Sequence, residues 1–269
     1  MSLLKQENAM ENTAAVSEGI VKLFLAANMP RLAEGDLYLG IPHSILERFH
    51  EALSLQISDD EDSKFRNRMR YAGILRERTE NTFKWDDNTY PLAETGLIEQ
   101  ILTLGFIGQR KNLILSGPAG VGKTLFSLII ACKAIREGLS VKYKTAHDIV
   151  TELHEARSGN SLSGYIKKMQ SKDLLVIEDI TFSTLEIKTA QSFFSIIDKR
   201  YGRKTTIITT NGNVKEWTKK FPDKGMCTAL IGRLYDDAIL LNMNGAADMR
   251  LTRTRGIIHE GEKEGVIYG

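Results

Sequence analysis

Residues 112–124 read NLILSGPAGVGKT, and this stretch decides the fold. A short apolar run leads into the pattern Gly-x-x-x-x-Gly-Lys-Thr at 117–124, and apolar residues at helical spacing follow from Leu125 to Cys132. A strand, a glycine-rich loop and a helix in this order form the context that a phosphate-binding loop requires. The alternative, a glycine-rich turn that matches by chance, does not account for the flanking strand and helix. We therefore predict a nucleotide site here.

The residue types of this loop match the chemistry of a phosphate chain. Glycine has no Cβ, so at 117, 120 and 122 the backbone can adopt positive φ and turn its N–H groups toward phosphate oxygens. The N-terminal end of the following helix adds a positive partial charge. Lys123 would reach the β- and γ-phosphates, and the Thr124 hydroxyl would bind Mg²⁺. The predicted cofactor-binding residues are Gly117, Pro118, Ala119, Gly120, Val121, Gly122, Lys123, Thr124 and Leu125.

The composition is that of an ordinary globular protein, with 42% hydrophobic and 26% charged residues among 269. This length suffices for one α/β domain and an appendage. The apolar runs all fall short of the roughly 20 residues that cross a bilayer, and the N-terminus lacks a secretory pattern, so we expect a cytoplasmic protein with no membrane partner. Two cysteines, Cys132 and Cys227, are too few for a disulfide framework or a four-ligand zinc site.

Strands and helices alternate through most of the chain. The predicted strands after the loop are Val141–Thr145, Leu174–Ile177, Lys204–Thr210 and Ala238–Met243. The predicted helices are Leu92–Ile107 before the loop, and Ala146–Arg157, Ser163–Ser171, Ala190–Tyr201, Val214–Phe221 and Thr228–Tyr235 after it. This alternation predicts an α/β fold with a mostly parallel sheet covered by helices on both faces. Ligands bind beyond the carboxyl ends of such strands, where Gly117, Glu178 and Asn211 emerge.

A small helical domain is predicted at the N-terminus, over residues 1–82. Its helical patterns cover Glu18–Ala27, a segment that opens at Pro42, and a separate segment that opens at the acidic run Ser58–Asp62. The last segment carries the basic residues Lys64, Arg66, Arg68, Arg70, Arg76 and Arg78. These side chains form either a solvated helix face or a surface for nucleic-acid phosphates or a partner subunit, and the sequence does not separate the two.

The nucleotide domain is predicted over residues 83–255, with a tail at 256–269. The domain begins with a polar and aromatic connector that contains Phe83, Trp85 and Tyr90. One of these rings could close over the base of a nucleotide, although packing is the more ordinary use of a single aromatic ring.

Two carboxylates, Glu178 and Asp179, directly follow the apolar run Leu174–Ile177. Carboxylates at the end of a buried strand are costly unless they meet a cation, and a Mg²⁺ beside Thr124 would supply one. Glu178 would then hold the metal shell together with Thr124, and Asp179 would orient and deprotonate the attacking water. The alternative is an acidic pair that merely caps the following helix.

Three further residues are candidates for the site. Asn211, at the end of a predicted strand, is suited to hold the same water or the γ-phosphate with its amide. Arg233 has the planar guanidinium that suits a developing phosphoryl charge, and if supplied across a subunit boundary it implies an oligomer. A salt bridge to Asp236 or Asp237 is the ordinary alternative for this arginine. Arg250 is a weaker second candidate for the same role.

These motifs resemble the IstB/DnaC group of AAA+ ATPases, which comprises transposition helper proteins and replicative helicase loaders. The resemblance extends from about Arg66 to Arg255, and its later part is closer to IstB than to DnaC. Besides the phosphate loop and the Leu174–Asp179 run, the matching stretches are YKTAHDIV at 143–150, RY at 200–201, IITTN at 207–211, EW at 216–217, TALIGRL at 228–234 and LLN at 240–242. The fold that the resemblance implies is an AAA+ P-loop NTPase.

The resemblance implies an ATPase that uses ATP and Mg²⁺, forms a homo-oligomer on DNA, and completes each site with the neighbour's Arg233. IstB-like proteins bind and deform duplex DNA for a transposase, whereas DnaC-like proteins grip single-stranded DNA and open a replicative helicase. Duplex DNA and a transposase are therefore the favoured partners, and a helicase loader is the alternative. A metabolic P-loop kinase is a third possibility, but no acceptor-binding insert or lid is evident. The resemblance also draws attention to Lys167, Lys168 and Lys172 for DNA contact, mainly to phosphates.

The order of the acidic pair departs from the family pattern. The family usually ends this strand with Asp then Glu, whereas here Glu178 precedes Asp179. The shorter side chain must then reach the water, and a general base displaced by about 1 Å costs on the order of a hundredfold in rate. We predict slow hydrolysis, with ATP acting chiefly as an assembly switch.

Overall fold

The computed structural model describes residues 18–25, 42–79, 95–180, 185–211, 217–219 and 221–244. Phe83, Trp85, Tyr90, Arg250 and the predicted tail at 256–269 lie outside these residues. The chain divides into two compact units, Met1–Asn67 and Arg68–Gly269. Within the described residues, no helix combines the length and apolar character needed to cross a membrane.

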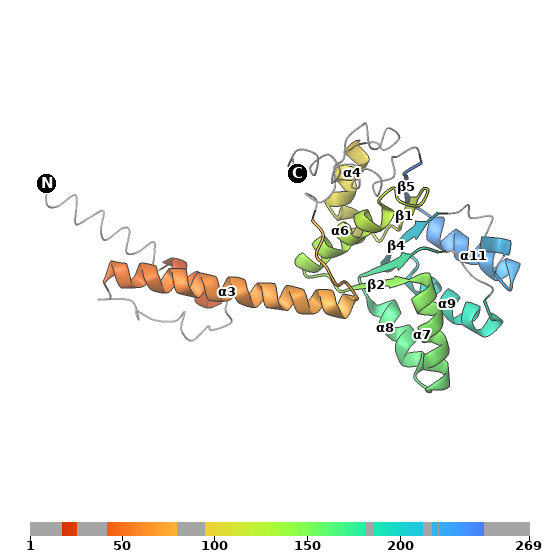
Figure 1. Ribbon diagram of the computed structural model, residues 1–269, viewed down its shortest axis with the longest axis horizontal. Coiled ribbons are helices and arrows are strands. Elements are labelled where there is room, and N and C mark those ends of the chain that lie inside the picture. Colours follow the sequence, from red (N-terminus) through yellow and green to blue (C-terminus); the bar gives the residue numbers. More distant parts are fainter. Residues whose placement is uncertain are drawn as a thin grey trace, which may run out of the picture. The chain divides into compact units, whose positions relative to one another are not determined.

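A long helix, α3 (His43–Ala72), dominates the described part of the first unit (Figure 1). The prediction of two helices with a start at the acidic run is wrong, because the helix continues through that run. No glycine or proline interrupts it, and local pairs support its surface, such as the hydrogen bond from Gln56 Nε2 to Asp60 Oδ1 at 3.2 Å. Residues 18–25 are also helical. A small apolar cluster joins them to α3 through Ile20, Phe24, Leu46 and Leu53.

The second unit is built on a five-stranded sheet in the order β2-β3-β4-β1-β5. The strands are β1 (Leu113–Ser116), β2 (Val141–Thr145), β3 (Leu174–Glu178), β4 (Thr205–Thr210) and β5 (Ile239–Asn242). Every neighbouring pair is parallel. The predicted α/β fold is therefore confirmed, and all the strands present their carboxyl ends at one edge of the sheet.

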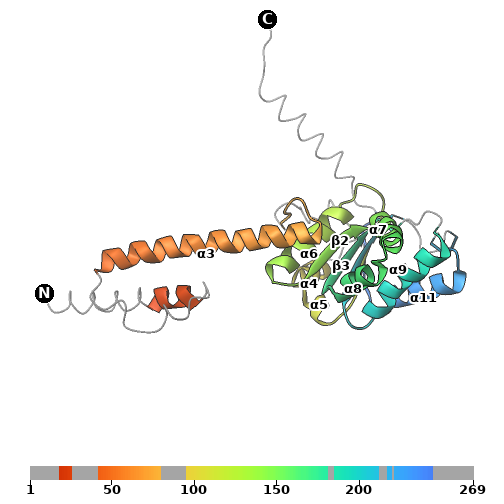
Figure 2. The same cartoon turned by 90° about the horizontal axis from the view of Figure 1, so that it is seen from below.

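Helices cover both faces of this sheet. They are α4 (Thr95–Leu102), α5 (Gly105–Gly108), α6 (Lys123–Arg136), α7 (Ala146–Ser158), α8 (Leu162–Ser171), α9 (Ile187–Arg200) and α11 (Lys224–Tyr235). Figures 1 and 2 show α6 on one side of β2 and β3, and α7, α8 and α9 on the other. The single helix predicted before the loop is two helices, because Leu104 takes a left-handed φ of 61° between them. Half of the helix predicted over Val214–Phe221 falls outside the described residues, and residues 217–219 are helical.

Alternation along the strands decides which side chains face α6. In β3 and β4, the side chains of Leu175, Ile177 and Ile208 belong to the core under α7, α8, α9 and α11. Since successive strand residues point to opposite faces, Val176 and Glu178 point toward α6. Tyr143 is the register partner of Val176 and shares its face. One face of the sheet thus carries Tyr143 and Glu178 toward the helix that begins with the phosphate loop.

Asp173 ties together the N-terminal ends of three neighbouring strands. It lies just before β3, and its carboxylate accepts hydrogen bonds from Ser140 N at 3.0 Å and Ser140 Oγ at 2.6 Å, next to β2. Lys204, next to β4, donates from Nζ at 2.6 Å. Burial raises the pKa of the Asp173 carboxyl, but the bonds from Lys204 and Ser140 outweigh burial and bring its pKa down to about 2.

Arg200 is a charged side chain inside this framework, and only 1% of its surface is exposed. Its guanidinium donates to the carbonyls of Met169 at 3.0 Å, Lys172 at 2.6 Å and Thr205, and to Thr206 Oγ1 at 3.1 Å. Burial lowers its pKa to about 9, which leaves it protonated at neutral pH. One arginine therefore joins the end of α8 to the start of β4.

Candidate nucleotide-binding site

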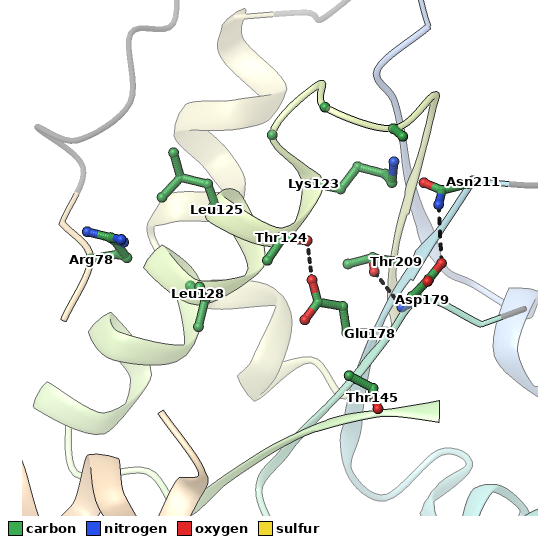
Figure 3. A pocket seen from close by; sticks show the side chains of 13 residues that line it. Arg78, Lys123, Thr124, Leu125, Leu128, Thr145, Glu178, Asp179, Thr209 and Asn211 are labelled. Atoms are coloured by element: carbon green, nitrogen blue, oxygen red, sulfur yellow. Dashed lines mark hydrogen bonds between the residues drawn. The ribbon is translucent and has the colours of Figure 1, made fainter. Parts of the chain in front are cut away.

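A pocket of about 460 Å³ lies at the carboxyl ends of the strands, within the second unit (Figure 3). The phosphate loop and the start of α6 form one wall of the pocket, through Ala119, Gly120, Gly122, Lys123, Thr124, Leu125 and Leu128. The strand ends contribute Thr145, Glu178, Asp179, Thr209 and Asn211, and Arg78 completes the lining. The loop residues and the acidic pair, which are distant in the sequence, thus line one space.

The loop has the backbone conformation that its glycines predict. Gly120 and Gly122 have φ angles of 88° and 94°, which side chains with a Cβ rarely adopt, and α6 begins immediately afterwards at Lys123. A Cβ on Gly117 would approach the backbone of Met243 to 3.1 Å, so this position also favours glycine, which has no side chain. The loop therefore leads directly into the N-terminal end of a helix, where backbone N–H groups and the helix dipole favour an anion.

Lys123 adds a positive charge inside the loop. Only 7% of the residue is exposed, and Nζ donates to Gly117 O at 2.7 Å and to Pro118 O at 2.6 Å. The ammonium group is thus held beside the loop backbone rather than in bulk water. A bound phosphate chain would find this charge next to the N–H groups of the loop.

Thr124 and Glu178 meet across the pocket. The Thr124 hydroxyl donates to Glu178 Oε1, which confirms that α6 and β3 bring the two predicted metal ligands together. Hydroxyl and carboxylate oxygens are the ligands that suit Mg²⁺. No group of three His, Cys, Asp or Glu side chains suited to a metal occurs within the described residues. The Thr124 and Glu178 oxygens fit a cation that takes its remaining ligands from water and phosphate, as Mg²⁺ commonly does.

Tyr143 holds the other oxygen of Glu178. Its hydroxyl lies 3.1 Å from Glu178 Oε2 and 2.9 Å from Ser127 Oγ on α6. Burial, and then the nearby Glu178 carboxylate, raise the pKa of Tyr143 well above its usual value, so the hydroxyl keeps its proton. No motif in the sequence points to this tyrosine, although its place in β2 beside the acidic strand carries the signal.

Asp179 has an unusual backbone conformation, with φ at 51°. Asp is one of the few residue types that tolerate this left-handed region. Its N–H donates to Thr209 Oγ1 at 2.9 Å, and its Oδ1 accepts from Asn211 Nδ2 at 3.2 Å. Figure 3 shows Asp179 and Asn211 paired at the strand ends. The structure thus brings Asp179 and Asn211 together with Glu178, as the sequence predicts, while their chemical roles stay predictions.

Arg78 is a pocket residue that the sequence analysis missed. Figure 3 shows it on the same side of the pocket as Leu125 and Leu128, away from the acidic pair. Two leucine side chains and a planar guanidinium provide surfaces for an aromatic base. In the sequence Arg78 is one of several arginines in a basic run, and nothing there distinguishes it from Arg76.

Comparison with known proteins identifies the family of the chain. Residues 43–256 match the family described as "IstB-like ATP binding protein". The chain belongs to the IstB-like ATP binding protein family. The resemblance drawn from the motifs is therefore confirmed.

Relatives of this IstB-like chain are described as insertion-sequence proteins. It is 27% identical over 202 residues to the "Insertion sequence IS5376 putative ATP-binding protein" of Geobacillus stearothermophilus, a match that covers 75% of this chain and 80% of the relative. It is 30% identical over 162 residues to the "Insertion sequence IS232 putative ATP-binding protein" of Bacillus thuringiensis subsp. berliner, which covers 60% and 65% respectively.

Solved structures share the fold of the IstB-like chain at low sequence identity. AMPPCP-bound DnaA from Aquifex aeolicus aligns with a TM-score of 0.53 and 19% identity, over 68% of this chain and 55% of that one. A crystal structure of DnaI aligns with a TM-score of 0.53 and 15% identity, over 62% and 90%. These likenesses confirm the AAA+ fold.

Arg233 of the IstB-like chain lies away from this pocket and is not among its lining residues. Its Nε donates to Asp198 Oδ1 at 2.5 Å, and its guanidinium lies 4.8 Å from the centre of the Phe194 ring. The ordinary alternative named Asp236 or Asp237 as its partner, and both are wrong: Asp236 accepts from Tyr201, and Asp237 pairs with Lys111. Arg233 is therefore engaged by α9 and is not brought to the pocket of its own chain.

Proposed function

We propose that this chain is a Mg²⁺-dependent ATPase that oligomerises on DNA and assists a transposase. The observation that carries the ATPase part is the contact of Thr124 with Glu178 beside the buried Lys123. Loop N–H groups and Lys123 would bind the β- and γ-phosphates, while Thr124 and Glu178 would hold Mg²⁺, which neutralises phosphate charge when bound. Arg78, Leu125 and Leu128 would flank the adenine.

Asp179 is proposed as the general base of hydrolysis. A water between its carboxylate and the γ-phosphate would lose its proton to Asp179, while the amide of Asn211 orients the same water. The Asn211 contact to Oδ1 leaves Oδ2 of Asp179 available for that water. The short reach of this carboxylate supports slow turnover.

The test of nucleotide binding is a fluorescent ATP analogue titrated with Lys123→Ala and the parent. We expect the variant to lose at least tenfold in affinity, because a buried charge in the loop is removed. Lys111→Ala is the matched control, since Lys111 forms an ion pair with Asp237 away from the pocket and should not affect binding. Equal affinity of parent and Lys123→Ala would contradict the proposed site.

The proposed supply of Arg233 from a neighbouring copy has a specific test. Arg233→Ala keeps its own phosphate loop, and Lys123→Ala keeps its arginine. Each variant alone should hydrolyse ATP poorly, whereas a mixture should recover activity at shared interfaces. No recovery in a mixture that still forms oligomers would contradict the arrangement.

DNA binding is proposed to occur mainly through phosphates. Lys167 and Lys168 are exposed on α8, and Lys172 follows its end. If both exposed lysines contact duplex phosphates, Lys167→Ala/Lys168→Ala should reduce the slope of log K against log salt concentration by about 2.

Electron microscopy with ATP, Mg²⁺ and either duplex or single-stranded DNA should show assemblies on duplex DNA. A stable complex with a replicative helicase, and none with a transposase, would instead favour the loader.

A further inference from the structure

Four hydrogen-bonded contacts form a closed ring beneath the phosphate loop. Thr124 Oγ1 contacts Glu178 Oε1, Glu178 Oε2 lies 3.1 Å from Tyr143 Oη, Tyr143 Oη lies 2.9 Å from Ser127 Oγ, and Ser127 Oγ lies 3.0 Å from Thr124 O. Ser127 is 0% exposed and Tyr143 is 8% exposed. The ring therefore links α6 to both β2 and β3, with Ser127 and Tyr143 on its buried side and Thr124 on its exposed side.

The number of protons decides the direction of these bonds. An ionised carboxylate only accepts hydrogen bonds, so the single proton of Tyr143 must be donated to Glu178 Oε2. The single proton of Ser127 then goes either to Thr124 O or to Tyr143 Oη. In both cases the Tyr143 hydroxyl acts as donor toward Glu178.

We propose that Tyr143 is a positioning residue for the Mg²⁺ ligand Glu178. This inference rests on the proposed ATP and Mg²⁺ site. By occupying Oε2, Tyr143 leaves Oε1 directed at Thr124, which is where the metal would be bound. A glutamate has one more rotatable bond than the aspartate usual at this position, and a second anchor restricts that freedom. Ser127 fixes the tyrosine in turn to the helix that carries Thr124.

The experiment measures Mg²⁺ dependence rather than turnover alone. A fluorescent ATP analogue is bound at increasing Mg²⁺ concentrations, and separately in EDTA, by the parent and by Tyr143→Phe. Loss of a group that orients a metal ligand typically costs 10- to 100-fold in metal affinity, so the Mg²⁺ midpoint should rise by about tenfold or more. Binding in EDTA should not change, because the phosphate loop is intact. Tyr165→Phe is the matched control, since Tyr165 lies on α8 outside the pocket.

A second variant tests whether the effect passes through Glu178. In a Glu178→Gln background, which also loses Mg²⁺ affinity, adding Tyr143→Phe should raise the Mg²⁺ midpoint by less than twofold, because the carboxylate is already absent. If Tyr143→Phe does not fold, Ser127→Ala is measured instead and should raise the midpoint less, in the same direction. If the parent binds the nucleotide and the folded variant has an unchanged Mg²⁺ midpoint, the inference is overturned. If the parent itself fails to bind, the proposed function fails instead.

Discussion

Asp179→Glu tests the consequence of the reversed acidic pair. The substitution adds one methylene, which extends the reach of the carboxylate by roughly 1.5 Å. A general base misplaced by about 1 Å costs on the order of a hundredfold in rate. If the reach of Asp179 limits hydrolysis, the longer side chain should increase kcat by about 10- to 100-fold, which corresponds to about 1.4–2.7 kcal/mol of activation free energy.

The same substitution should reduce stability. Asp179 has φ at 51°, and Glu lacks the short side chain that makes Asp tolerant of this region. The hydrogen bond from Asn211 at 3.2 Å would also be displaced. We expect the free energy of unfolding to fall by about 1 kcal/mol. Phosphate release at saturating ATP and Mg²⁺, and urea unfolding of the same samples, measure the two effects separately.

Asp179→Asn is the matched control for this prediction. Asn also tolerates positive φ and can keep the contact to Asn211, but its amide cannot accept a proton from water. Its turnover should fall by about 100-fold or more, with little change in stability. If Asp179→Glu turns over at the rate of the parent, the reach of Asp179 does not limit hydrolysis. If Asp179→Asn does so, the Asp179 carboxylate is not the general base.

Three other substitutions test the framework and the base-binding part of the pocket. Arg200→Met should lower the free energy of unfolding by about 3–5 kcal/mol in urea titrations, because buried carbonyls lose their donor. Asp173 has a pKa lowered from 3.8 to about 2, so its stabilising contribution is present above pH 4 and is lost as pH falls toward 2; Asp173→Asn should flatten the stability profile in that window. Arg78→Leu should weaken binding of a fluorescent ATP analogue by about fivefold, and competition by inorganic triphosphate should not change.

The phosphate loop and the order of strands could be predicted from the sequence because their determinants are local. The motif at 117–124 places its glycines, lysine and threonine within eight consecutive residues, and no distant contact is needed to define it. The strands that follow are short apolar runs bounded by turn residues, which identify buried parallel strands. Since parallel strands share one carboxyl edge, the meeting of Thr124 with Glu178 follows from that topology.

Other features could not be predicted because they depend on distant packing. The pairing of Arg233 with Asp198 joins α11 to α9, whereas sequence reasoning considered only neighbours along the chain. The burial of Arg200 requires carbonyls from the end of α8 and the start of β4 to converge on one guanidinium. The unbroken α3 has a different cause: an acidic run is typical of a helix start, but here side-chain pairs on the helix surface accommodate it within the helix.

The order of Glu178 and Asp179 matches the local geometry at each position. The glutamate extends far enough for its two oxygens to contact Thr124 and Tyr143, and an aspartate there would be one methylene short of that span. The aspartate occupies a backbone conformation that disfavours longer side chains, and Thr209 fixes it through its N–H. Each position is therefore suited to its residue for stability, whereas the family's usual order of Asp then Glu would favour the rate of ATP hydrolysis. In the double variant Glu178→Asp/Asp179→Glu, the shorter carboxylate at position 178 should lose its contact with Tyr143, and the longer side chain should strain position 179. Stability and Mg²⁺ affinity should therefore fall together even if the general base gains reach.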